Sequence, residues 1–152
     1  MGKVVSLTGK DTHKINGRIL NDFADGDCVQ IEYESDLVAA KKGKNGNTIY
    51  AVNETGKMSK ATYRLLVGSA DDKFMNALLQ TFVNDPAAFT LMTGESVKRT
   101  GDGAGAITPV TYAMTGGLIK KQPSVKDNAE GDTEQASVTW EVIFGNSQRS
   151  IG

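Results

Sequence analysis

Apolar and polar residues alternate along two segments of the chain, and this period of two constrains the fold more than any other feature of the sequence. In CVQIEYE (residues 28–34), one face of the pattern is apolar: Val29, Ile31 and Tyr33. In SVTWEVIFG (137–145), the apolar face is longer: Val138, Trp140, Val142 and Phe144. Successive side chains of a β-strand point to opposite faces of its sheet, so both segments are predicted to be strands with one buried face. Shorter strand candidates at 61–68 and 88–94 extend the prediction to a sheet-rich protein.

Two later stretches echo each other and predict a pair of neighbouring strands. LMTGESVKRTG (91–101) and AMTGGLIKKQP (113–123) share Met-Thr-Gly followed by apolar and basic residues. The glycine-rich segment 101–109 between them is suited to the connection, with Gly94 and Gly116 as sites of bulges. The polar segment 122–135 contains little that packs, and is predicted to be an exposed loop before the last strand.

One helix is predicted among the strands, over residues 69–85. Ser69 is placed as its N-cap, Asp72 follows as in a capping box, and Pro86 lies just beyond its end. The face predicted to pack on the sheet recurs at helical spacing: Phe74, Ala77, Leu78, Thr81 and Phe82. Because the 152 residues are 39 % apolar, the chain is expected to form one domain over residues 1–152.

The chain offers little material for catalysis or for cofactor binding. Cys28 is the only cysteine and His13 the only histidine, so the sequence predicts neither a disulfide nor a metal cluster. KKGKNGNTIY (41–50) lacks the G-x-x-x-x-G-K-[ST] pattern of a phosphate loop, and GDGAGA (101–106) lacks the third glycine of a dinucleotide site. We therefore expect a protein that is not an enzyme and has no cofactor. The absence of a long apolar run predicts a soluble protein, made and kept in a cytoplasm, with no membrane segment.

The lysine-rich segment 41–47 is predicted to be the tip of a β-hairpin. Asn45 and Gly46 both tolerate the positive φ of a type I′ turn, and TIYAV (48–52) follows as a strand. The charges around this tip are segregated along the chain. Residues 21–36 carry only acidic charges: Asp22, Asp25, Asp27, Glu32, Glu34 and Asp36. Residues 37–60 are mainly basic: Lys41, Lys42, Lys44, Lys57 and Lys60, against Glu54.

Opposite charges in neighbouring segments have two interpretations. In a monomer they pair internally or are solvated. In a protein that meets copies of itself head to tail, the acidic block of one copy faces the basic block of the next. The second interpretation gives these candidate inter-subunit contacts: Lys41, Lys42, Lys44, Asn45, Asn47, Asp22, Asp25 and Asp27.

Three segments, in this order and spacing, carry a resemblance to a known family: INGRILNDFADGD (15–27), KKGKNGNTIYAVNETG (41–56) and LLVGSADDKFMNAL (65–78). Together they resemble the tail tube proteins of contractile-tailed bacteriophages, which are related to the tubes of contractile bacteriocins and type VI secretion systems. The resemblance covers about the first 80 residues. The second half of the chain is similar only in its character.

The resemblance implies a mainly β protomer, in which two packed antiparallel sheets with one flanking helix form a sandwich or barrel. Six protomers would form a ring whose inner strands close into a continuous barrel, and rings would stack into a hollow conduit through which DNA passes into the host. The implied partners are further copies of the chain, the tail sheath protein, baseplate and tail terminator proteins, and genomic DNA bound without sequence specificity. The implied location is the phage tail of the virion, assembled in the host cytoplasm.

A conduit for DNA is served by a neutral or acidic lumen, because like charge keeps the phosphate backbone from sticking. The polar faces of the two clearest strands supply the candidate lumen residues: Gln30, Glu32, Glu34, Thr139 and Glu141. Other interpretations stay open at the level of sequence. The tube of a bacteriocin or of a secretion machine would have the same pattern, a small monomeric β-sheet binding module is a second class, and a phosphate-binding enzyme is a remote third.

Overall fold

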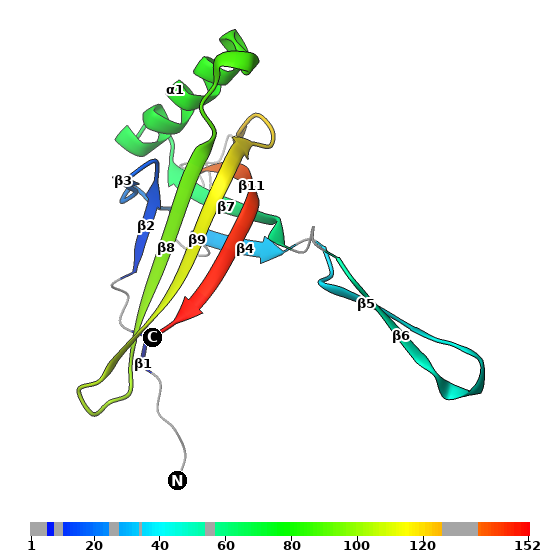
Figure 1. The fold of residues 1–152 in the computed structure, drawn as a ribbon. Coiled ribbons are helices and arrows are strands. Elements are labelled where there is room, and N and C mark those ends of the chain that lie inside the picture. The colour runs from blue at the N-terminus through cyan, green and yellow to red at the C-terminus, as the bar shows by residue number, and fades with distance from the viewer. Residues whose placement is uncertain (1–5, 8–10, 25–27, 34, 54–56, 126–136) are drawn as a thin grey trace, which may run out of the picture.

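The computed structural model describes residues 6–7, 11–24, 28–33, 35–53, 57–125 and 137–152 (Figure 1). Strands dominate these residues, with one α-helix and two short 3-10 turns among them. In chain order the elements are β1 (Ser6–Leu7), β2 (Thr12–Ile15), β3 (Arg18–Ile19), β4 (Val29–Tyr33), β5 (Val38–Lys42), η1 (Lys44–Gly46), β6 (Thr48–Val52), β7 (Ser59–Leu66), α1 (Ala70–Asn84), η3 (Pro86–Ala88), β8 (Met92–Gly101), β9 (Ile107–Ile119), β10 (Ser124–Val125) and β11 (Ser137–Ile151).

A single nine-stranded antiparallel sheet forms the body, in the order β3-β2-β8-β9-β11-β7-β4, with β1 paired to β8 and β10 to β11. The long strand β11 belongs to two layers of this sheet. Its residues Ser137–Phe144 pair with β7, whereas Val142–Ile151 pair with β9. Figure 1 shows β7 and β4 running across behind β8 and β9. We call the layer of β4, β7, β10 and the first half of β11 the β4 layer, and the layer of β2, β8, β9 and the second half of β11 the β8 layer.

The predicted class, mainly β with one helix, is confirmed. The two layers are joined through β11 into one continuous sheet, and the second sheet of the protein is the separate hairpin β5–β6. The described strands do not close into a barrel within one protomer. The predicted neighbours at 91–101 and 113–123 do pair, as β8 with β9, and their register shifts between Met92 and Gly94 as expected of a bulge.

The core lies between the two layers and is built by the alternation seen in the sequence. The predicted apolar face of β11 is buried: Val138, Trp140, Val142 and Phe144. It meets Tyr63 and Leu65 from β7 and Met92 and Met114 from the β8 layer. Glycine is required where the layers approach closely, because a Cβ on Gly94 would lie 2.7 Å from the ring of Phe144.

Helix α1 begins as the sequence predicts, and of its predicted inward face Phe74 and Leu78 pack against the core, but its fully buried stripe lies beside them. The Ser69 hydroxyl accepts the backbone N–H of Asp72 at 3.3 Å, which is the capping contact. The buried residues are Asp71, Met75 and Leu79, whereas Ala77 and Thr81, predicted to be inward, are exposed. The spacing of four residues places all three buried side chains on one stripe. The stripe is rotated from the predicted one because two aspartates bind the body: Asp71 contacts the loop after β3, and Asp72 accepts the Trp140 indole N–H at 3.0 Å.

Candidate assembly surfaces

The predicted lumen residues that the structure describes lie together on one face of the β4 layer. Gln30 on β4 is opposite Thr62 on β7, and Thr62 is opposite Glu141 on β11. Residues directly opposite each other in paired strands point to the same face of a sheet. Since the neighbouring row Val29–Tyr63–Trp140 points into the core, this row points outward. Glu32 and Thr139 share the outward face by the same alternation.

The expectation for this outward face was neutral or acidic, and the structure shows that its carboxylates are paired with lysines. The Lys60 ammonium lies 3.8 Å from a carboxylate oxygen of Glu32 and 3.7 Å from one of Glu141. The Lys121 ammonium lies 3.2 Å from the other oxygen of Glu141. Burial opposes ionisation of Glu141, but the hydrogen bond from Lys121 and the charges of Lys121, Lys60 and Lys120 outweigh it and hold the pKa of Glu141 below its usual value.

From the sequence, β7 was not assigned to this face, although the alternation along β7 would have indicated it. Lys60, Thr62 and Arg64 alternate with the buried residues Ala61, Tyr63 and Leu65. The strand was predicted, but its polar residues were not assigned to the same face as those of β4 and β11. The face is therefore a band of polar residues across three adjacent strands, wider than the predicted one.

Within the acidic block, Asp22 is held at the start of helix α1 by contacts with Asp71. The Asp22 backbone N–H donates to a carboxylate oxygen of Asp71 at 2.8 Å, and its own carboxylate accepts the Asp71 N–H at 3.3 Å. Asp71 is buried and also binds the Arg18 guanidinium, 3.2 Å from its other oxygen. Asp22 is thus engaged inside the protomer. Asp25, Asp27 and Glu34 lie outside the described residues.

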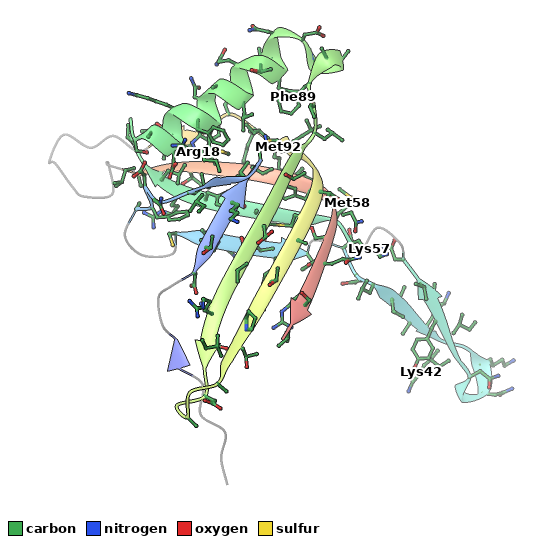
Figure 2. All side chains as sticks on the ribbon, turned by 60° about the vertical axis from the view of Figure 1, so that its left-hand side comes forward. Arg18, Lys42, Lys57, Met58, Phe89 and Met92 are labelled. Atoms are coloured by element: carbon green, nitrogen blue, oxygen red, sulfur yellow. The ribbon has the colours of Figure 1, made fainter. Side chains whose placement is uncertain are left out.

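The lysine-tipped segment forms the predicted hairpin, and this hairpin projects away from the body (Figure 1). Figure 2 shows Lys42 towards its far end. Asn45 and Gly46 have φ values of 69° and 81°, the left-handed conformation that their sequence favours. The loop between the paired residues Lys42 and Thr48 is closed by the Gly43 N–H, which donates to the Asn47 carbonyl at 2.6 Å. Lys41, Lys44, Asn45 and Asn47 lie at this tip and are all exposed.

Both strands of the hairpin are exposed along their whole length. The pairing places Val38, Val52, Ala40 and Tyr50 on one face and Ala39, Ala51, Lys41 and Ile49 on the other. The apolar side chains of β6 are more exposed than those of any described strand of the body: Ile49 at 62 %, Tyr50 at 69 % and Val52 at 79 %. An isolated two-stranded hairpin is marginally stable in water, so this element lacks the packing that stabilises the body.

Among the described strands, the β4 layer ends on each side in a strand that pairs on one side only. β4 pairs with β7 only, so among the described strands nothing pairs with its outer side. On the other side of the layer, Leu118–Ile119 of β9 and the short strand β10 pair with β11, and no described strand pairs beyond them. We call this second border, residues 118–125, the β10 edge. Open edges present rows of backbone donors and acceptors, which is a ready site for pairing with another chain.

A crevice of about 260 Å³ opens between the layers beside β4. Val29 and Ile31 of β4 form its apolar side, opposite Ser96 and Tyr112 of the β8 layer. His13 also lines it, and its Nδ1 lies 3.0 Å from the Ser96 hydroxyl. Burial lowers the pKa of His13, with a raising contribution from Asp11 and a lowering one from Lys98. Cys28 lines the same crevice, but in the part of the chain that the structure describes no three histidine, cysteine or acidic side chains are grouped to hold a metal ion.

The fold is found in solved components of contractile injection systems. The chain matches the tube-terminating cap of the anti-feeding prophage with a TM-score of 0.59 and 8 % identity, over 94 % of this chain and 89 % of that one. It matches a chain of the PVC sheath–tube complex, from an extracellular contractile injection system in its extended state, with a TM-score of 0.56 and 9 % identity, over 93 % of this chain and 87 % of that one. The PVC sheath/tube terminator in the extended state gives 0.54 and 11 %, over 93 % and 92 %.

At these identities the likeness shows the fold, and it extends over nearly the whole of each chain. No family model matches the sequence, and no curated protein does. The chain therefore shares its architecture with structural parts of contractile tail-like assemblies. Among the described residues, no helix is both long and apolar enough to cross a membrane.

Proposed function

We propose that the protein is the tail tube subunit of a contractile phage tail, in which rings of six copies stack into a hollow conduit for DNA. The β5–β6 hairpin is the observation that carries this proposal. It exposes Ile49, Tyr50 and Val52 on an element whose two strands are exposed along their whole length. Burying apolar surface is the main favourable term of association, so a second copy is the natural cover for this hairpin.

The charges of the hairpin fit the same role. Lys41, Lys42 and Lys44 stand at the far end of the projection, where they meet the acidic surface of the next copy in the ring or in the next ring. Asn45 and Asn47 are at the same tip and supply neutral hydrogen-bonding groups. Asp25 and Asp27 remain proposed contacts on the acidic side, while Asp22 has the weaker case because its carboxylate already binds α1.

The outward face of the β4 layer is the proposed wall of the lumen, lined by Gln30, Glu32, Glu34, Thr139 and Glu141. The ion pairs of Glu32 and Glu141 with Lys60 bring the charge of this wall closer to neutral. Because Lys60 and Lys121 are paired with carboxylates, they offer DNA phosphates less positive charge, so DNA would slide without sequence-specific contacts. The proposed partners outside the tube are the sheath, the baseplate and the tail terminator, with the virion tail as the location.

Electron microscopy of the purified protein at high concentration tests the proposal. Hollow tubes of stacked rings are the expected result. A species of 16.2 kDa by light scattering, unchanged as concentration rises, would contradict it and support a monomeric binding module.

Two of the three similar structures are a cap and a terminator, which favours a tube-terminating ring as the second candidate. Rings that form but never stack would support that candidate. A third possibility, the tube of a bacteriocin or secretion machine, has the same architecture. Nuclease protection of DNA inside tubes isolated from the native particle would distinguish a DNA conduit from it.

A further inference from the structure

We infer that three side chains at the crevice beside β4, His13, Ser96 and Tyr63, form an acid-sensitive joint between the two layers, which a proton on His13 opens to water. His13 on β2 and Ser96 on β8 belong to the β8 layer and line the crevice. Tyr63 on β7 belongs to the β4 layer and is fully buried. The joint lies within one protomer, so this inference does not depend on the proposed function.

The His13 imidazole contacts both layers. Its Nδ1 lies 3.0 Å from the Ser96 hydroxyl, which is the contact within the β8 layer. Its ring packs edge-on against Phe23, with the two ring centroids 5.4 Å apart and an angle of 81° between the planes. The Phe23 backbone pairs with Leu65 of β7, so this second contact reaches the β4 layer. A change in the charge of His13 therefore acts on the place where the layers meet.

The Tyr63 hydroxyl is the buried donor that the joint has to satisfy. Among the described residues, it has no hydrogen-bond partner of full geometry. The Ser96 hydroxyl is nevertheless close enough to lower the pKa of Tyr63, against the larger raising effect of burial. Because a buried hydroxyl without an acceptor costs stability, Ser96 Oγ is the acceptor that a small side-chain adjustment supplies.

The number of donors in the joint depends on the charge of His13. A hydroxyl donates one proton and accepts through its oxygen, and a neutral imidazole has one nitrogen that accepts. With Nδ1 of His13 unprotonated, Tyr63 donates to Ser96 and Ser96 donates to His13, so both hydroxyl protons have an acceptor. A protonated His13 donates from Nδ1, which leaves three donors for two links. One buried donor then has no acceptor until water enters the crevice.

The charges around His13 leave this effect in place. Asp11, just before β2, attracts a proton on His13, whereas Lys98 on β8 repels it. These two side chains are paired with each other, with the Lys98 ammonium 3.6 Å from a carboxylate oxygen of Asp11. The other titratable side chains that line the crevice are Cys28 and Tyr112, and Arg149 donates to the Tyr112 hydroxyl at 3.1 Å.

Linkage gives the direction of the effect and its pH window. Burial lowers the pKa of His13 in the closed crevice below its ordinary value of 6.5, whereas an open crevice hydrates the imidazole. The open form therefore binds the proton more readily, and opening becomes more favourable as the pH falls through 6.5 towards the pKa of the closed form. One unsatisfied buried donor shifts the opening equilibrium by roughly tenfold.

The reactivity of Cys28 tests the joint, because Cys28 is the only cysteine and lines the crevice. The whole chain is labelled with a dithiodipyridine reagent between pH 7 and 5, under conditions where light scattering gives the same size throughout. Each rate is divided by that of the urea-unfolded chain at the same pH, which removes the pH dependence of the thiol itself. We expect this ratio to rise roughly tenfold, with an unchanged near-ultraviolet signal from the buried Trp140.

Two variants separate the joint from a general loss of stability. His13→Gln keeps a hydrogen-bonding side chain that gains no proton, so its ratio should stay at the neutral wild-type value. Ser147→Ala is the matched control, because Ser147 on β11 forms a buried hydroxyl pair with Ser59 on β7. This variant loses a polar contact between the same layers that contains no titratable group, and it should keep the wild-type rise.

Three outcomes of the labelling would overturn the joint. They are the same rise in His13→Gln, no rise in the wild-type protein, and a Trp140 signal that changes in step with the labelling. Loss of the rise in Ser147→Ala would also count against it, because any weakened contact between the layers would then have the same effect.

Nuclear magnetic resonance of the single imidazole gives a second measurement that needs no variant. Above pH 7 the nitrogen chemical shifts of His13 should place its proton on Nε2, since Nδ1 accepts from Ser96. A proton on Nδ1 at that pH would overturn the joint. None of these outcomes tests assembly, so the proposed function stands or falls separately.

Discussion

The body and the β5–β6 hairpin are both antiparallel, and they differ in where their side chains go. Strands β7 and β11 of the body bury every second side chain, and Trp140, Tyr63 and Phe144 are almost fully buried. The hairpin has the same pairing geometry and turn residues suited to it, but every residue of its two strands is exposed. Backbone pairing is thus common to both, and packing is not. The comparison teaches that side-chain packing stabilises the body, whereas the two strands of the hairpin bury none of their side chains.

Among the substitutions that test this contrast, Trp140→Ala should cause the largest loss of stability. Removing a fully buried indole leaves a cavity and should lower the free energy of unfolding by about 3–5 kcal/mol. Urea denaturation followed by circular dichroism measures it. The matched variant is Tyr50→Ala on the hairpin, which should leave the midpoint unchanged while reducing assembly. A large shift for Tyr50→Ala would mean that the hairpin packs on the body, and the contrast would be wrong.

A smaller effect is expected from Gly94→Ala. The added methyl would lie 2.7 Å from the Phe144 ring, and relief of this contact should cost about 1–3 kcal/mol of unfolding free energy. Gly43→Ala is the control on the hairpin, because its added methyl would meet its nearest atom at 3.6 Å, an ordinary contact. Thermal melts of both variants check the difference, and equal melting temperatures would refute the steric account.

Acid should weaken the body through His13. Burial lowers the pKa of His13 in the folded state below its unfolded value of 6.5, so the unfolded chain binds more protons around that pH. Stability should therefore be full above the unfolded pKa and fall as the pH drops through 6.5 towards the folded pKa. His13→Gln should flatten this part of the profile. An unchanged slope between pH 7 and 5 in the variant would assign the dependence to other groups.

The smallest effect on stability, about 0.5 kcal/mol or less, is expected from reversing Lys41, Lys42 and Lys44 to glutamate, because all three are exposed. The same variant should nevertheless lose tube growth, and high salt should loosen wild-type stacking. The triple change to glutamine removes the charge without reversing it and should give an intermediate result. Normal tubes from the glutamate variant would exclude the lysines as inter-subunit contacts.

Local patterns in the sequence predicted the elements better than their arrangement. The alternation in 137–145 gave the buried face of β11, Asn45-Gly46 gave the hairpin, and Ser69 gave the start of α1. The inward face of α1 was predicted in part: Phe74 and Leu78 pack against the core, but buried Asp71 was missed. Asp71 is charged, and its hydrogen bonds from the Asn21 and Asp22 backbone explain why it lies inside. The pairing of β2 with β8 joins segments about eighty residues apart, which no local period encodes.

The candidate surfaces show the same limit. The polar rows of β4 and β11 were identified from the sequence, and the structure brings them onto one face. Lys60 was placed with the basic block, but it lies between Glu32 and Glu141, because β7 runs between the two predicted strands. Which residues meet another copy depends on how strands follow one another across the sheet, and that order is set by the whole core.

Strand β11 runs for 15 residues through both layers without a break. A force applied to one layer is therefore transmitted to the other through the continuous backbone of β11 and through its hydrogen bonds with β7 and β9. In the proposed tube, such a protomer would resist shear between its two layers. The continuous backbone of β11 thus links the two layers mechanically, in addition to the stability that its buried side chains provide.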